Sequence, residues 1–227
     1  MILKTNIIAA IAVATMAVSA TWASATAQSS SPQASPATPA TPTIPDRAGV
    51  WGDIVYGDPD APVELIEYGS LTCPHCASFS RDVLPRLMQD FINDGKLRFV
   101  FRNFVRDRFD LAAAAGSRCM ADVDATKRTL NTLFAEQARW LQADNPLGAI
   151  AEIVGREGLD QEALTACLKD QQVRVHIVEM TQDGAKKYNI KGIPTLVLNG
   201  VSMSFPGYPA LKLRIEAQLG SDYLNQE

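Results

Sequence analysis

The stretch Val63-Glu64-Leu65-Ile66-Glu67-Tyr68 runs through Gly69-Ser70-Leu71-Thr72 into Cys73-Pro74-His75-Cys76. The first six residues are mostly apolar and β-prone, so they predict a short strand, and the next four predict a turn. Apolar residues then recur at helical spacing: Phe79, Val83, Leu84, Leu87, Met88 and Phe91. Two cysteines separated by two residues therefore stand where a strand passes into a helix, and there they are expected to form a redox-active dithiol.

Cys73 at the start of the predicted helix is expected to favour the thiolate, because unpaired backbone N–H groups and the positive end of the helix dipole stabilise an anion there. Pro74 suits the first helical position, since its missing N–H would have had no partner. His75 adds positive charge near the same sulfur. A cysteine in such a setting has a pKa of about 3.5 to 7.5 instead of about 8.5, which makes the disulfide oxidising. Cys76, one turn further along, is expected to be the resolving thiol.

Other kinds of site also use a C-x-x-C pair. A zinc site would need a second C-x-x-C or paired histidines at matched spacing. The other candidate ligands, Cys119, Cys167 and His176, each stand alone in the sequence. No metal site is therefore predicted, although a purely structural disulfide and the delivery of a soft metal such as Cu(I) stay open as alternatives.

The first 27 residues predict a secretory signal peptide. Lys4 is their only charged side chain, residues 7–20 are apolar or small, and Ala25-Thr26-Ala27 offers a cleavage site. Export to the periplasm is therefore expected, and an uncleaved signal that anchors the chain to a membrane is the alternative. Residues 28–45 hold five prolines and no charged side chain among Ser, Ala, Thr and Gln. They predict a disordered linker.

About 180 residues remain, enough for one domain with a sizeable core. The whole chain has a net charge of −4, and removal of Lys4 leaves 20 basic against 25 acidic side chains, a balance of −5. A mildly acidic chain without a basic stripe is not expected to bind nucleic acid. Four cysteines in an exported chain indicate an oxidising compartment and up to two disulfides.

Beyond the dithiol helix, which Pro85 is expected to kink or break, the chain predicts further strands and helices. The expected strands are residues 50–56, 63–68, 97–104, 195–198 and 201–205, the last two joined across Asn199-Gly200, with helices in 107–187 and 209–219. Within the helical block, Asp160 is expected to cap a helix. This order is that of an α/β thioredoxin fold, residues 46–106 and 188–227, with a helical domain, residues 107–187, inserted into it.

Over residues 50–220 the chain resembles the DsbA family of thiol:disulfide oxidoreductases. The resemblance rests on Cys73-Pro74-His75-Cys76, on Glu67 six residues earlier, on the helical block and on Lys191-Gly192-Ile193-Pro194-Thr195. It implies a monomeric periplasmic enzyme that donates a disulfide to reduced or unfolded exported proteins and needs no organic cofactor. It also implies reoxidation by a DsbB-like membrane partner.

The resemblance assigns roles to residues outside the dithiol. It implies a cis peptide bond at Ile193-Pro194 facing the active site, with the backbone of Ile193 free to pair with an extended substrate segment. It implies that Glu67 lies beneath the cysteines and assists proton movement at Cys76, whereas the alternating strand would also allow its side chain to point to solvent.

A subset of the same family carries a second cysteine pair in the helical block. By that resemblance, Cys119 and Cys167 are expected to form a structural disulfide, with a second redox centre that tunes the first as the alternative.

Two rival functions stay open. A disulfide isomerase or reductase has the same fold, and Ile193 before the proline matches neither the Val of the enteric oxidase nor the Thr of the isomerases. A soft-metal-binding module would use the dithiol as a ligand. The arginines near the third expected strand are interpreted as solvated charges with no role in a site: Arg98, Arg102, Arg106 and Arg108.

Overall fold

The computed structural model describes residues 52–220, so the expected signal peptide and linker, and the first residues of the expected strand 50–56, lie outside the described residues. Five strands form one mixed sheet in the order β1-β3-β2-β4-β5. The strands are β1 (Ile54–Tyr56), β2 (Val63–Gly69), β3 (Leu97–Asn103), β4 (Thr195–Leu198) and β5 (Val201–Ser204). β2 and β3 are parallel, and the other three pairs are antiparallel. The predicted thioredoxin fold is confirmed, and the exact domain boundaries stay a prediction.

The helix that connects β2 to β3 is continuous but not regular. It consists of α2 (Pro74–Ser78), the π-helical turn η1 (Phe79–Val83), α3 (Leu84–Leu87) and a second π-helical turn η2 (Met88–Ile92). Pro85 lies in the first turn of α3. A proline there removes an N–H and crowds the carbonyl one turn earlier, and the wider turn of η1 makes room for its ring. The expected kink is thus a local widening, and the helix does not break.

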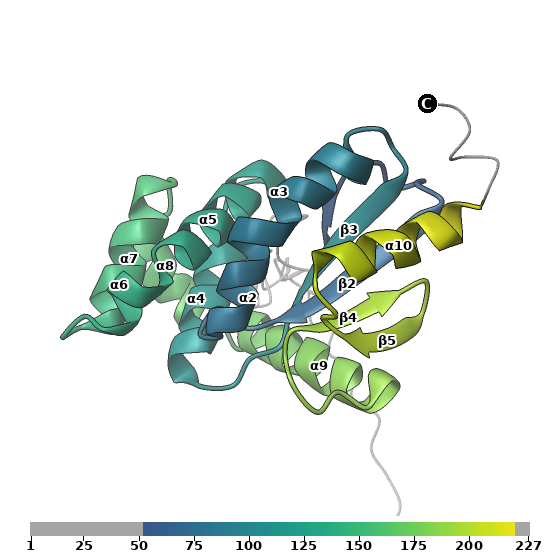
Figure 1. Cartoon of the computed structure of the whole chain (residues 1–227). Coiled ribbons are helices and arrows are strands. Elements are labelled where there is room, and N and C mark those ends of the chain that lie inside the picture. Colours follow the sequence, from purple (N-terminus) through teal and green to yellow (C-terminus); the bar gives the residue numbers. More distant parts are fainter. Residues whose placement is uncertain (1–51, 221–227) are drawn as a thin grey trace, which may run out of the picture. The chain divides into compact units, whose positions relative to one another are not determined.

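Six helices between β3 and β4 form the helical insertion, which Figure 1 shows gathered mainly beside the sheet. They are α4 (Arg108–Arg118), α5 (Val123–Ala135), α6 (Gln137–Leu141), α7 (Pro146–Arg156), α8 (Gln161–Lys169) and α9 (Gln171–Tyr188). Asp160 caps α8 as expected, by accepting a hydrogen bond from the backbone N–H of Ala163 at 2.8 Å. The buried side chains between Leu130 and Trp140 are shared by two helices, because α5 ends at Ala135 and α6 begins at Gln137.

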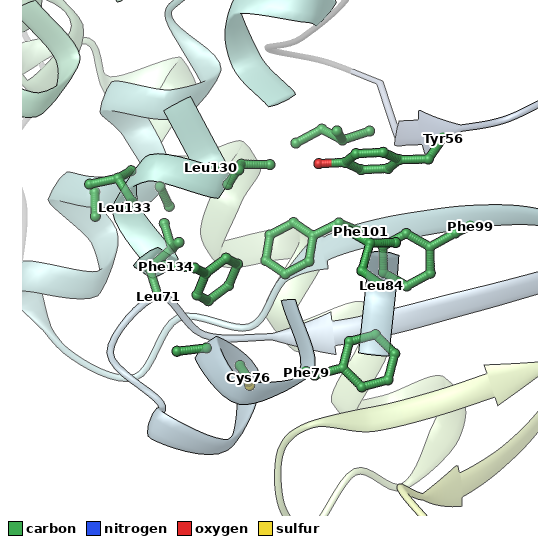
Figure 2. Packing of buried hydrophobic residues seen from close by; sticks show 14 of the residues in the cluster. Tyr56, Leu71, Cys76, Phe79, Leu84, Phe99, Phe101, Leu130, Leu133 and Phe134 are labelled. Carbon is green, nitrogen blue, oxygen red and sulfur yellow. The ribbon is translucent and has the colours of Figure 1, made fainter. Parts of the chain in front are cut away.

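The main core lies between the sheet and the helices α2 to α8, with further buried residues from α9 and α10. Figure 2 shows the aromatic rings of β1 and β3 facing the leucines and Phe134 of α5, with Cys76 at the edge of this cluster. Phe101 and Phe134 meet edge to face with ring centroids 5.7 Å apart. Because side chains alternate along a strand, Glu67 points to the same face as Leu65, which belongs to this core. The strand that carries the dithiol turn is therefore buried on both faces.

The second face of the sheet is covered by α9. A smaller cluster there contains Ile66, Tyr68, Val100 and Val197. Gly184 of α9 lies against Tyr68, and a Cβ added at this glycine would approach the Tyr68 ring to 2.3 Å. The absence of a side chain at this one position allows the helix to pack closely on the sheet. The final helix, α10 (Tyr208–Leu219), lies beside the sheet after β5 (Figure 1).

A buried arginine connects the segment before β1 to β3 and to α9. Arg118 of α4 is fully buried. Its guanidinium donates to the Gly52 carbonyl at 2.9 Å, to Asn103 Oδ1 at 2.7 Å and to Met180 Sδ at 3.4 Å. These partners belong to the segment before β1, to β3 and to α9. Burial lowers the pKa of Arg118 to about 10, so it keeps its charge at neutral pH.

Cys119, directly after α4, forms a disulfide with Cys167 of α8 across 48 residues of sequence. Both cysteines are buried. In the chain-entropy view, a cross-link over a loop of this length restricts the unfolded chain and stabilises the fold by about 4 kcal/mol.

We expect the double substitution of Cys119 and Cys167 by Ala to lower the free energy of unfolding by about 4 kcal/mol, because the unfolded chain regains the freedom of this loop. Urea denaturation of the oxidised proteins measures the difference. The potential of the Cys73-Cys76 pair, measured in parallel, should not change. A large change in that potential with little loss of stability would instead favour the second redox centre.

Candidate active site

Cys73 and Cys76 lie at the start of the irregular helix, as the sequence predicts. Cys73 is the N-cap residue of α2 and has an extended backbone, with Pro74 at the first helical position. Pro74 and His75 are exposed, whereas both cysteines are buried. The two thiols are free, so the structure presents the reduced pair.

Hydrogen bonds to the Cys73 sulfur favour its thiolate. The Cys76 thiol gives the largest contribution, followed by the backbone N–H groups of Cys76 and His75 and by the positive charge of Arg106. Burial works in the opposite direction, but the net effect lowers the pKa of Cys73 to about 5. Cys73 is therefore ionised at neutral pH, as its position at a helix start led us to expect.

Cys76 has the opposite tendency. Its thiol donates to Cys73, its sulfur is buried, and the carboxyl of Glu67 is close enough to repel a second negative charge. All three effects raise the pKa of Cys76 far above its ordinary value. One thiolate and one thiol therefore share the site at neutral pH.

Glu67 lies behind the dithiol in the core, and the alternative that its side chain points to solvent is wrong. The residue is 2% exposed, and its Oε1 atom accepts no hydrogen bond from the described residues. A cavity of about 10 Å³ adjoins it, with Tyr56, Ser80 and Asn131 among the lining residues. Such a volume is close to the minimum for one water molecule. Burial, and then the negative charge of Cys73, raise the pKa of Glu67 well above its ordinary value.

The loop before β4 closes the site on the opposite side of Cys73. The Ile193-Pro194 peptide bond is cis, and the Cys73 Sγ atom lies 3.7 Å from the Ile193 carbonyl oxygen. A groove of about 450 Å³ begins beside this contact. Its lining residues come from the dithiol helix and from the segments around β4 and β5: His75, Ser78, Phe79, Asp82, Val83, Gly192, Ile193, Pro194, Ser204 and Phe205.

The helical insertion and the loop that leads into it hold the turn before Cys73 through four side chains, which we call the turn clamp: Arg106, Asp107, Asp110 and Gln137. Gln137 Nε2 donates to the carbonyls of Leu71 at 2.8 Å and Cys73 at 3.0 Å. Asp107 Oδ2 accepts from the Thr72 hydroxyl at 3.1 Å. The turn is thus bonded through its backbone and its side chains to residues that follow it by more than 30 positions.

The turn clamp was not predicted from the sequence. Arg106 is solvated, as interpreted, but it contacts the active-site turn, so the interpretation that it lies apart from the site was wrong. Arg106 is exposed, but its Nη2 atom lies 3.3 Å from the Thr72 carbonyl oxygen. The available signal was the Asp107-x-x-Asp110 spacing, which is typical of a helix start and so of side chains that bond to backbone N–H groups. The other arginines are placed elsewhere: Arg98 pairs with Glu64 and Arg102 with Asp53.

Two other residue sets named from the sequence lie apart from the groove. Cys119 and Cys167 belong to the contact between α4 and α8. His176 is half-buried on α9. Within residues 52–220, no group of three or more His, Cys, Asp or Glu side chains is placed to hold a metal ion, and no helix there is long and apolar enough to span a membrane.

The family model described as thioredoxin matches residues 50–215. Disulfide bond formation protein D of Bacillus subtilis is 31% identical over 181 residues, which cover 76% of this chain and 80% of that protein. The chain belongs to the DsbA-like thioredoxin family. Alpha-DsbA1 of Wolbachia pipientis has a similar crystal structure, with a TM-score of 0.69 and 26% identity over 77% of this chain and 94% of that one. Oxidised BdbD of Bacillus subtilis, also 26% identical, has a TM-score of 0.64 over 74% of this chain and 92% of that one.

Other DsbA-like relatives are longer than this chain. A Rickettsia conorii protein is 29% identical over 149 residues, and its name describes it as a protein-disulfide oxidoreductase. The match covers 66% of this chain but 54% of the relative, so the chain spans about half the length of such proteins.

For this DsbA-like site we expect Cys73 to titrate with a midpoint near pH 5, followed by thiolate absorbance at 240 nm in the reduced protein. Because the pKa is lower in the folded state than the ordinary value of 9.0, ionisation of Cys73 stabilises the reduced fold above about pH 9. That contribution should be lost as the pH falls to about 5, so the stability of the reduced form relative to the oxidised form should decrease over this range. The variant Cys73→Ser should show no transition near pH 5, and a wild-type midpoint above pH 8 would contradict the assignment.

We expect Glu67→Gln to raise the free energy of unfolding at pH 7.5, because burial raises the pKa of the Glu67 carboxyl in the folded state. A carboxyl whose pKa is higher in the folded state than in the unfolded state destabilises the fold as the pH rises above its unfolded value, and the amide does not titrate. The difference should disappear at pH 4, where the carboxyl is protonated in both states. Denaturation at the two pH values tests this, and an equal difference at both would assign the effect to packing.

Proposed function

We propose that this chain is a periplasmic thiol:disulfide oxidoreductase that donates the Cys73-Cys76 disulfide to reduced exported proteins. The observation that carries the proposal is the unequal environment of the two thiols, which lowers the pKa of Cys73 and raises that of Cys76. A stabilised Cys73 thiolate favours the reduced pair, and a pair that favours its reduced form oxidises other thiols.

The reaction proceeds in two exchanges. A substrate thiolate attacks the Cys73 sulfur, which forms a mixed disulfide, breaks the Cys73-Cys76 bond and releases Cys76 with the electron pair. Cys76 then takes up a proton, because its thiolate is unfavourable in the buried site. A second substrate thiolate attacks the substrate sulfur of the mixed disulfide, and Cys73 leaves as the thiolate. The substrate gains a disulfide, and the enzyme gains the two electrons.

Glu67 is the group that we assign to proton movement at Cys76. It is buried beside the two cysteines, and burial raises the pKa of its carboxyl well above the ordinary value, which favours the protonated form. When Cys76 is released as a thiolate in the buried site, the protonated Glu67 can give its proton to that sulfur, which leaves the single negative charge on the Glu67 carboxylate. The cavity beside Glu67 leaves space for a water molecule that returns the proton.

Substrate binding is assigned to Ile193, Pro194 and the adjoining groove. An extended substrate segment would pair with the backbone of Ile193, which already approaches Cys73 through its carbonyl. Main-chain hydrogen bonds give affinity with little dependence on side chains, so the proposed enzyme would accept many unfolded proteins. Phe79 and Phe205 meet edge to face in the groove wall and offer an apolar contact to the substrate.

The proposed cycle needs an oxidant outside this chain. A quinone-linked membrane partner of the DsbB type would accept the electrons of the reduced pair, and no organic cofactor of its own is needed. We propose export by cleavage of a signal within residues 1–27, with residues 28–45 as a linker and membrane anchoring by an uncleaved signal as the alternative. The domain from residue 46 onward would act as a monomer.

The reduction potential of the Cys73-Cys76 pair tests the direction of the reaction. Equilibration of the mature protein with glutathione, with Cys119 and Cys167 intact, should give a value nearer that of DsbA, about −120 mV, than that of thioredoxin, about −270 mV. A value at or below that of thioredoxin would replace the proposed oxidase by a reductase or isomerase. Stoichiometric soft metal in the purified protein, with little oxidation of substrate thiols, would replace it by a metal-binding module.

We further expect Cys76→Ser to accumulate a mixed disulfide through Cys73 with a single-cysteine peptide supplied as its glutathione disulfide, because the Cys73 thiolate displaces glutathione and the thiol that would release the peptide is missing. Mass spectrometry of the non-reduced complex should place the bond at Cys73. The matched variant Cys73→Ser should form at least tenfold less of it, since Cys76 is fully buried. Equal yields from the two variants would reverse the assigned roles.

A further inference from the structure

We propose that Arg106, held over the active-site turn by Asp110 and Thr72, is a positioning residue that sets the oxidising power of the Cys73-Cys76 pair. This inference rests on the proposed oxidase function and adds to it a residue from the loop between β3 and α4. Arg106 does not contact the reacting sulfurs through any hydrogen bond, so it would act through the turn and through its charge.

The guanidinium of Arg106 is bonded to the residue directly before Cys73. Its Nη2 atom donates to the Thr72 carbonyl oxygen and to Thr72 Oγ1, each at 3.3 Å. Thr72 is in turn fixed by its hydroxyl, which donates to Asp107 Oδ2 at 3.1 Å. A positive charge therefore lies next to the peptide that links Thr72 to Cys73, on the same turn that presents the sulfur.

Asp110 ties the Arg106 backbone and the turn to one carboxylate. Its Oδ2 atom accepts from the backbone N–H of Arg106 at 3.0 Å and from the Ser70 hydroxyl at 2.5 Å, and its Oδ1 atom accepts from the Leu71 N–H at 2.8 Å. Asp110 is fully buried. Because both segments bond to the same rigid group, the base of the Arg106 side chain has a fixed position relative to the turn.

Asp110 is mostly ionised at neutral pH, although its pKa is raised. Burial raises the pKa of Asp110 to about 6, and the nearby negative charge of Asp107 contributes to the rise. The bonds from Ser70, Leu71 and Arg106 oppose it. An ionised carboxylate accepts all three bonds, whereas a neutral amide at the same place would turn a donor toward one of them.

The cation affects the equilibrium between the two redox states. A positive charge near Cys73 stabilises its thiolate, which exists in the reduced pair and not in the disulfide. Loss of the charge should therefore make the disulfide a weaker oxidant. Since the Arg106 side chain is exposed, salt should screen its effect, in contrast to the buried hydrogen bonds from α2.

The test compares Arg106→Met with Arg108→Met, which removes the same charge two residues away. Arg108 is exposed and lies over the ring of Phe109, and none of its hydrogen bonds reaches the active-site turn. We expect Arg106→Met to raise the pKa of Cys73 by about 0.5–1 unit, measured by absorbance at 240 nm. A rise of one unit in the pKa of Cys73 corresponds to a reduction potential of the Cys73-Cys76 pair that is about 30 mV more negative. Arg108→Met should change the pKa of Cys73 and the reduction potential by less than about a third as much as Arg106→Met does.

Three further measurements separate positioning from general structural damage. Arg106→Lys should restore part of the effect, because it returns the charge without the planar fork. The difference between wild type and Arg106→Met should shrink at 1 M salt. The shift caused by Arg106→Met should be smaller in an Asp110→Asn background than in the wild type, because the carboxylate that fixes the Arg106 backbone is then already missing. Unfolding curves and circular dichroism of each variant establish that it is folded.

The outcomes distinguish this inference from the proposed function. If the wild type is strongly oxidising and neither variant differs from it in the pKa of Cys73, the role of Arg106 is overturned and the oxidase function remains. Equal shifts in both variants also overturn it, because net charge alone would then explain them. A wild-type potential near that of thioredoxin contradicts the oxidase, whatever the variants show.

Discussion

The site depends on one electrostatic constraint: its interior favours a single negative charge among three acidic groups. Cys73, Cys76 and Glu67 are close enough for the charge of one to raise the pKa of another. Hydrogen bonds from the helix start place that charge on Cys73, at the surface end of the group. The aromatic side chains of β3 and the leucines of α5 surround Cys76 (Figure 2) and lie around Glu67, and this burial raises the pKa of both groups. Packing of the main core therefore also determines the acid-base properties of the dithiol.

The helical insertion contributes directly to this arrangement. Asp110 and Gln137 belong to α4 and α6, yet their side chains bond to the turn that leads into the dithiol helix. Without these bonds, the backbone groups of a buried turn would lack partners, which costs free energy. The insertion thus completes the hydrogen bonding of the thioredoxin unit and is more than a cover over its sheet. This dependence gives a physical reason why the two parts of the chain form one core.

The features predicted correctly from the sequence have local causes. Alternating apolar residues, the Asn199-Gly200 turn and the cysteine pair after a strand each determine the structure of a few neighbouring residues, and the fold follows from their order. The side chain of Glu67 could have been assigned to the core from its spacing to Leu65, but its partners could not. Arg106 bonds to Thr72 across 34 residues, and Gln137 bonds to Cys73 across 64. Such contacts depend on how α4 and α6 dock, and no periodic pattern encodes that. The π-helical turns around Pro85 are likewise a compromise between a local clash and core packing.

The bonds of Arg118 have a mechanical consequence. Gly52 begins the described chain, and its carbonyl is bonded to a buried guanidinium that also holds β3 and α9. A pulling force on the preceding segment would therefore enter the domain through α4 and be shared by three elements, instead of acting first on β1, which has three residues at the edge of the sheet. A tether attached at this end would bear tension without peeling the edge strand, and the dithiol would keep its geometry while the domain is held.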